Sequence, residues 1–269
     1  MKNIKYSLFV LVCLSFTSCL NTSERKTDLQ NLGLKGNVKS IIEKKYEAVM
    51  KFGEISKGDI EENYSLYSDS GYAFIYNFNR DANLKDIVNY SYYGDMDSKR
   101  IMKYDENKNC VENVKYDSEG KSEEKIVSNF DENNKCLQTI FYNSNGSMDY
   151  KYHFIYGDEG YCKKMFVYSS HGSLDCHYDH KYYNNNNLFE TTKFSSNGSK
   201  KRLTTFKYNE LNNCTEYSTV AYNDYGNQKS IAIFKYKYDR HNNWIERIEY
   251  TGDNEKVESI IERKIEYYN

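Results

Sequence analysis

Residues 104–129, YDENKNCVENVKYDSEGKSEEKIVSN, decide the fold because they are one copy of a unit that recurs along the chain. An aromatic residue opens the unit, a second aromatic and a glycine follow, and each of these positions recurs at steps of 26 residues. The first aromatic column is Phe78, Tyr104, Phe130, Tyr156, Tyr182 and Tyr208. The second column is Tyr90, Tyr116, Tyr142, Tyr168 and Phe194, and the glycines are Gly94, Gly120, Gly146, Gly172 and Gly198. A final copy, with Tyr222, Gly226 and Tyr238, is stretched by two to four residues.

Each unit divides into two strands and two turns. Residues 110–116 alternate as a strand does, and the chain returns through residues 121–130 as a second strand. The turns are rich in Asp, Asn, Ser and Gly, which bond their own backbone or accept the left-handed conformation of a hairpin loop. Loops this short force antiparallel neighbours, so the units predict a meander. The chain contains no proline, as expected for long uninterrupted sheet, because each proline removes a hydrogen-bond donor.

The array predicts an all-β domain, an antiparallel meander of 26-residue, two-strand repeats. Twisted sheets of more than roughly ten strands curl, split or close, so we expect a half-pipe or incomplete barrel. Outside the array, residues 37–49 predict an entry strand and residues 260–268 a closing strand. Residues 28–35 are expected to be a tether, and residues 52–62 are open between a loop and a short helix.

The turn after the first aromatic resembles the YD repeat of the Rhs family, whose signature is a Tyr-Asp pair, a turn with Gly or Asn, and a hydrophobic residue opening the next strand. The best matches are Tyr238-Asp239-Arg240-His241-Asn242-Asn243-Trp244 and Tyr104-Asp105-Glu106-Asn107-Lys108-Asn109-Cys110, and the resemblance covers residues 72–250. It implies an all-β curled sheet, and small cell-envelope lipoproteins carry such repeats. It implies no activity for any single residue.

The first residues indicate the destination of the protein. Lys2 and Lys5 form a basic region, residues 6–16 an apolar run too short to span a membrane, and Phe16-Thr17-Ser18-Cys19 a cleavage site with small residues. The segment resembles a lipoprotein signal peptide, which implies that Cys19 is acylated and anchors the chain to a membrane. We therefore expect a signal peptide at 1–18, a lipidated tether at 19–35, one β-repeat domain at 36–269, and a place at the outer membrane. The alternative is an ordinary secreted protein in which Cys19 is incidental.

Composition and motifs exclude several classes of function. The balance of 37 basic against 39 acidic residues argues against a nucleic-acid partner, because proteins that bind nucleic acids concentrate positive charge on one face. We find no nucleophile elbow, zinc-binding helix or phosphate-binding glycine loop, and we expect no enzyme. A glycosidase that uses two carboxylates on a β face stays open as the enzymatic alternative.

Four cysteines occupy the same position of the repeat unit, a position that holds large hydrophobic residues in other copies. They are Cys110, Cys136, Cys162 and Cys214, and the same position holds Leu84, Leu188 and Trp244 in other copies. Equivalent residues of a meander lie two strands apart, about 9.6 Å, whereas a disulfide needs Cα atoms within about 7 Å. We expect buried, reduced thiols in this column. Cys176 lies outside it and has no assigned partner.

No metal or other cofactor is expected. In Cys176-His177-Tyr178-Asp179-His180, strand alternation puts Cys176 and His180 on one face and His177 and Asp179 on the other, whereas zinc needs three or four ligands. The turn at residues 131–135 cannot supply the six to eight oxygens that calcium takes.

The position two residues after the cysteine column is polar in every copy, and it forms a stripe that we treat as a candidate binding site. Its members are Asp86, Glu112, Gln138, Lys164, Glu190, Glu216 and Glu246, and they share a face with Tyr116, Tyr142 and Tyr168. If Tyr116 pairs with Lys121, then Asp86 faces Lys99, Glu112 faces Lys125 and Gln138 faces Lys151. Such pairs contribute about 0.2–1 kcal/mol each and fix the register. The functional alternative is a stripe along a concave face that binds a ligand.

Two functional hypotheses from different classes follow. The first is a recognition or adhesion module of the cell envelope that contacts a polysaccharide or a protein through exposed tyrosines. The second is a structural or assembly component of the envelope without a soluble ligand.

Overall fold

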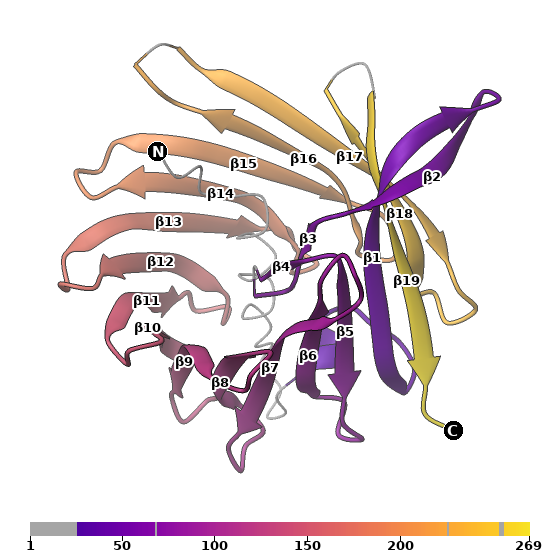
Figure 1. The fold of residues 1–269 in the computed structure, drawn as a ribbon. Coiled ribbons are helices and arrows are strands. Elements are labelled where there is room, and N and C mark those ends of the chain that lie inside the picture. The colour runs from indigo at the N-terminus through magenta and orange to yellow at the C-terminus, as the bar shows by residue number, and fades with distance from the viewer. Residues whose placement is uncertain (1–25, 68, 225, 253–255) are drawn as a thin grey trace.

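The computed structural model describes residues 26–67, 69–224, 226–252 and 256–269, and these are almost entirely antiparallel strands (Figure 1). The elements are α2 (Asp28–Asn31), β1 (Val38–Lys51), β2 (Glu54–Glu61), β3 (Asn63–Tyr64), β4 (Ser70–Gly71), β5 (Ala73–Phe78), β6 (Leu84–Tyr90), β7 (Met96–Tyr104), β8 (Cys110–Asp117), β9 (Ser122–Phe130), β10 (Cys136–Asn143), β11 (Met148–Tyr156), β12 (Cys162–Ser169), β13 (Leu174–Tyr182), β14 (Leu188–Ser195), β15 (Lys200–Tyr208), β16 (Cys214–Ala221), β17 (Gln228–Tyr238), β18 (Trp244–Thr251) and β19 (Lys256–Tyr267). The 26-residue units are the hairpins between β5 and β18.

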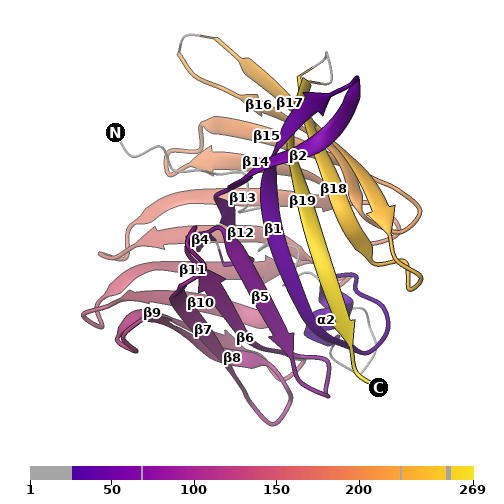
Figure 2. The ribbon, with the colours of Figure 1, turned by 45° about the vertical axis from the view of Figure 1, so that its right-hand side comes forward.

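Sixteen strands close into an antiparallel barrel (Figures 1 and 2). From β5 to β19 each strand pairs with the next, and β1 pairs with β19 on one side and with β5 on the other; Ile41 lies opposite both Ile265 and Tyr76. The expectation of a half-pipe or incomplete barrel was therefore wrong. The predicted entry strand closes the ring by joining the first and last strands, and this removes the two free edges that an open sheet would leave.

Apart from the stretched final copy, both turns of each unit have the same backbone geometry, a type I turn followed by a left-handed residue and a bulge. In the second turn, the Asp117 N–H donates to the Lys121 carbonyl at 2.9 Å, and Gly120 has φ +84°. In the first turn, the Asp105 N–H donates to the Asn109 carbonyl at 3.0 Å. Asp117 therefore pairs with Lys121, so the expected Tyr116–Lys121 register was wrong. Tyr116 lies opposite Ser122, and the bulge places Lys115 opposite Glu124.

The segment that carries β3 and β4 lies inside the ring of strands (Figure 1). It contacts the side chain of Arg100 on β7, so this face of β7 is the inner one and its neighbours alternate outward. One apolar cluster of the interior gathers on β1 and β5 to β7 around Phe74, Tyr76 and Ile87, and a second on β10 to β12 around Tyr152 and Met165.

Residues 28–35, expected to be a tether, pack against the barrel. Thr27 caps α2, and Leu29 and Leu34 are buried in the first apolar cluster. The Leu29 N–H donates to the Ala82 carbonyl at 3.1 Å, and the Lys35 N–H donates to Asn243 Oδ1 at 2.8 Å. The chain thus reaches the barrel at the end formed by the Asp/Asn turns, near the C-terminus (Figure 2).

The hairpin of β1 and β2 projects from the barrel (Figure 1). β1 continues to Lys51, beyond its last partners in β5 and β19, and there it pairs with β2 alone. The sequence was ambiguous between a loop and a short helix for residues 52–62, and the structure shows that they form mainly a strand. Phe52 and Gly53 make the tip, with φ +53° and +84°.

Candidate functional site

The polar stripe lies on the outer face of the barrel. Arg100 points inward, so Lys99 points outward, and so does Tyr116 directly opposite Lys99. By the same alternation, every member of the stripe faces outward: Asp86, Glu112, Gln138, Lys164, Glu190, Glu216 and Glu246. The stripe therefore follows the convex outside of the barrel rather than a concave surface.

Six of the seven stripe residues are in cross-strand ion pairs. The nitrogen–oxygen distances are 3.5 Å for Lys99–Asp86, 2.5 Å for Lys125–Glu112, 2.8 Å for Lys164–Asp179, 2.8 Å for Lys181–Glu190, 2.9 Å for Lys207–Glu216 and 2.7 Å for Lys237–Glu246. The first two are the expected pairs, although the bulge makes them diagonal neighbours. Their role in fixing the register accounts for the stripe without any ligand.

The tyrosines assigned to the stripe are on the same outer face and are half-buried. They are Tyr116, Tyr142 and Tyr168. The Lys151 ammonium lies 5.1 Å from the centroid of the Tyr168 ring, a cation–π contact that occupies one face of that ring. These three rings are half-buried on the outer face of the sheet, so they do not form a solvent-exposed surface on which a ligand could stack.

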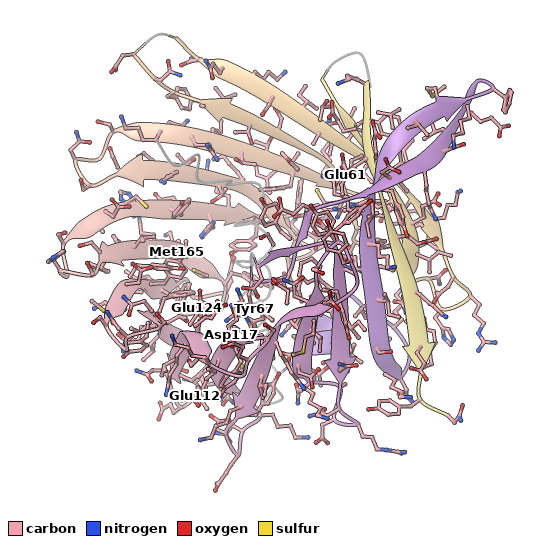
Figure 3. The ribbon with its side chains drawn as sticks, viewed as in Figure 1. Glu61, Tyr67, Glu112, Asp117, Glu124 and Met165 are labelled. Atoms are coloured by element: carbon pink, nitrogen blue, oxygen red, sulfur yellow. The ribbon has the colours of Figure 1, made fainter. Side chains whose placement is uncertain are left out.

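Inside the barrel, a buried ion cluster holds the segment between β3 and β4. Arg100 is 1% exposed, its guanidinium lies 2.9 Å from both Asp69 and Glu124, and it lies over the Tyr67 ring. Tyr67 and Glu124 of this cluster are labelled in Figure 3. Burial alone would lower the pKa of Arg100, but the two carboxylates raise it above its usual value. This cluster fixes the segment within the lumen, so that part of the barrel is packed.

The five cysteines of the described residues are thiols. Cys136, Cys162 and Cys176 are buried, and Cys110 and Cys214 are half-buried. Burial raises the pKa of Cys136 to about 11. The prediction of buried thiols in the packing column is confirmed for Cys136 and Cys162, whereas Cys110 and Cys214 of that column are only half-buried. Cys13 and Cys19 lie outside the described residues.

The predicted alternation at residues 176–180 is confirmed. Cys176 and His180 face the interior, whereas His177 stacks on Phe194 and Asp179 pairs with Lys164 on the outside. Within the ranges that the structure describes, no group of three or more His, Cys, Asp or Glu side chains is placed to hold a metal ion.

The glycine turns gather at one end of the barrel, and the turn at residues 91–95 differs in composition from four of its counterparts. Four turns carry polar residues at their two central positions: Ser118-Glu119, Ser144-Asn145, Ser170-His171 and Ser196-Asn197. The turn at residues 91–95 carries Tyr92 and Tyr93, which are 56% and 87% exposed. Its backbone is like the others, since the Ser91 N–H donates to the Asp95 carbonyl at 2.9 Å and Gly94 has φ +89°. The turn geometry therefore does not require these tyrosines.

Three tyrosine rings form a cluster at this turn, which we call the tyrosine turn (Tyr72, Tyr92 and Tyr93). The Tyr92 ring centroid lies 5.3 Å from that of Tyr72 and 5.5 Å from that of Tyr93, and both pairs are edge-to-face. In the sequence this turn is one member of the glycine column, and the signal that sets it apart is its departure from the polar composition of four counterparts.

No family model and no curated protein matches the chain. Among solved structures, a porin-like protein from Bacteroides uniformis superposes with a TM-score of 0.54 at 10% identity, over 86% of this chain and 99% of that one. A porin-like protein from Bacteroides vulgatus gives 0.37 at 14% identity, over 86% and 98%. The TcdB2-TccC3 structure gives 0.29 at 8% identity, over 81% of this chain and 15% of that one. The first likeness supports the barrel fold, and the YD-repeat resemblance stays a prediction.

Within the described residues, no helix has the length and apolar character needed to cross a membrane.

Proposed function

We propose that this protein is a recognition or adhesion module of the bacterial cell envelope that contacts a polysaccharide or protein ligand through the tyrosine turn. The observation that carries the proposal is the exposure of Tyr92 and Tyr93 where four equivalent turns are polar. Exposed aromatic rings do not help a type I turn to fold, whereas they offer a large contact area at a low cost in conformational entropy. The ligand surface is therefore this turn and not the outer stripe, whose charges are already paired.

The proposal includes a lipid anchor at Cys19 and a place at the outer membrane. The solved protein similar in fold is described as porin-like, but the outer face of this barrel carries rows of charged residues, among them Lys99, Lys125 and Lys151 near the middle of β7, β9 and β11. A lipid-facing lysine or arginine near the bilayer centre costs about 2–4 kcal/mol, so these rows favour a barrel held beside a membrane rather than within it. Because α2 packs at the Asp/Asn end, the described part of the chain begins at the end of the barrel opposite the tyrosine turn. The tyrosines would then point away from the anchoring membrane.

The anchor is tested by Cys19→Ala in the full-length chain. We expect the variant to lose its acyl chains and to leave the membrane fraction, while the parent protein stays there after a carbonate wash. Mass spectrometry of the mature N-terminus serves as the direct readout. A variant that still fractionates with membranes would rule out anchoring through this residue.

The binding site is tested with a variant that the repeat itself supplies. Tyr92→Ser with Tyr93→Asn converts Ser91-Tyr92-Tyr93-Gly94 into the sequence of Ser195-Ser196-Asn197-Gly198, so the turn should fold at least as well as before. We expect the parent protein, but not this variant, to bind isolated envelope polysaccharide or to retain an envelope protein in a pull-down. Ser196→Tyr with Asn197→Tyr is the matched control for aromatic residues in a different turn. Equal binding by the parent and the Tyr92/Tyr93 variant would refute the proposal.

The second candidate, a structural component of the envelope, is favoured by the closed barrel and its paired outer charges. It predicts that the Tyr92/Tyr93 variant behaves like the parent protein in every binding measurement.

A further inference from the structure

We infer that the tyrosine turn is a carbohydrate site for a neutral or amino-bearing polysaccharide, whose pyranose rings stack on Tyr92 and Tyr93 with Tyr72 as support. This inference rests on the proposed function and names the ligand class.

The ring geometry is the first argument. Tyr92 makes edge-to-face contacts with both Tyr72 and Tyr93, so the three rings restrain one another. Aromatic side chains have an apolar face and, in tyrosine, a polar edge that stays in water. The apolar face of a pyranose can stack on the apolar face of a tyrosine ring, while its hydroxyl groups, like the tyrosine hydroxyl, stay in water. Because Tyr93 is 87% exposed, its ring is open to such a ligand in the folded protein.

The charge beside the rings is the second argument. Asp95 and Asp97 lie two and four residues after Tyr93, and both are exposed. Asp97 accepts a hydrogen bond from Asn89 Nδ2 at 3.2 Å, which restrains its carboxylate. Carboxylates accept hydrogen bonds from sugar hydroxyl or ammonium groups, and they repel uronate or phosphate groups. The turn therefore fits a neutral or amino-bearing sugar and disfavours an acidic polymer.

The size of the cluster is the third argument. A specific protein interface buries about 800 Å² on each partner, whereas one aromatic side chain supplies about 150–250 Å² at most. Tyr92 and Tyr93 together, with the half-buried Tyr72 behind them, fall short of that area. A chain of a few sugar units needs only two or three rings, so the observations favour a glycan over a protein surface.

The test is calorimetric titration of the full-length mature protein, in detergent if it is acylated, with three sets of oligosaccharides. These are neutral β-glucan and mannan fragments, glucosamine oligomers, and oligo-uronates as the acidic set. We expect binding by at least one member of the first two sets and none of the third. Tyr93→Ala should weaken that binding at least about tenfold, and Tyr93→Phe, which keeps the stacking face, by less than about threefold. Asp95→Asn should weaken amino-sugar binding more than neutral-sugar binding.

The outcomes separate this inference from the proposed function. Binding to the acidic set alone, or glycan binding that Tyr93→Ala leaves unchanged, would overturn the assignment of the ligand class. A protein captured through Tyr92 and Tyr93, without glycan binding, would overturn this inference while the recognition function stands. If the Tyr92→Ser, Tyr93→Asn variant matches the parent protein in every assay, both are refuted.

Discussion

At the scale of single residues, the glycine turns hold backbone conformations that other residues adopt at a cost. Gly146 and Gly172 have φ +82° and +78°, and a Cβ atom added at either position would meet no atom within 4 Å. The cost of valine is therefore a backbone cost, about 1–3 kcal/mol. We expect Gly146→Val and Gly172→Val to lower the free energy of unfolding by similar amounts in urea titrations.

An asparagine variant is the matched control for this prediction. Asn134 and Asn212 both adopt φ +61° at the corresponding position of the other turn. Gly146→Asn should therefore cost clearly less than Gly146→Val. Hydrogen exchange should place the lost protection of the valine variant around residues 139–156. Unequal costs for the two valine variants would show that the turns are not equivalent.

His180 should make stability depend on pH. Its ring is buried, its Nδ1 lies 2.8 Å from Thr191 Oγ1, and burial lowers its pKa to about 4. The unfolded chain takes up this proton near pH 6.5, whereas the native protein does so only near pH 4. The stabilising contribution of neutral His180 is therefore complete above pH 6.5 and is lost as pH falls toward 4, by about 2–3 kcal/mol.

The comparison that isolates this effect is His180→Gln, because carboxylates also contribute to acid unfolding. Urea unfolding at pH 7.5 and pH 4.5 should show a larger loss for the parent protein than for the variant. Parallel losses in both proteins would mean that His180 is protonated in the native state.

At the scale of elements, the tyrosines of the first aromatic column link successive hairpins through hydrogen bonds from their hydroxyl groups. The Tyr156 hydroxyl donates to the carbonyl of Cys136 at 2.9 Å, and Tyr182 does the same to Cys162 at 2.9 Å. Tyr104 and Tyr208 make the equivalent bonds at 2.6 and 3.0 Å. Each bond reaches back twenty residues to the strand that opened the preceding unit. The period of the sequence is therefore also a period of tertiary hydrogen bonds.

Phe130 occupies this column without a hydroxyl group, and it provides a test. Phe130→Tyr should add the missing bond to the carbonyl of Cys110, whose oxygen has two lone pairs, and raise the free energy of unfolding by about 1 kcal/mol. Tyr182→Phe should lower it by about the same amount. Both changes are measured by urea titration, and a destabilising Phe130→Tyr would show that this copy does not share the column geometry.

At the scale of the whole molecule, closure makes the terminal strands interior strands. β1 has partners on both sides over Ser40 to Lys44, in β19 and β5. Native-state hydrogen exchange should therefore protect these amides as strongly as those of β10 to β14. The ribbon beyond Glu47 is the internal control, because its strands pair only with each other and two-stranded ribbons are marginally stable. Fast exchange throughout β1 would contradict closure.

The sequence by itself determined the strands, the turns and their glycines, the cysteine column and the fact that the stripe residues share one face of the sheet. These are local properties, since side-chain period and turn chemistry act between residues close in the chain. Only the tertiary structure decided that β1 joins β5 to β19, that residues 28–35 belong to the core, and that Asp69 is clamped to Arg100 within the lumen. Those contacts depend on the accumulated twist of sixteen strands, which returns the last strand to the first and leaves an interior for the inserted segment to fill.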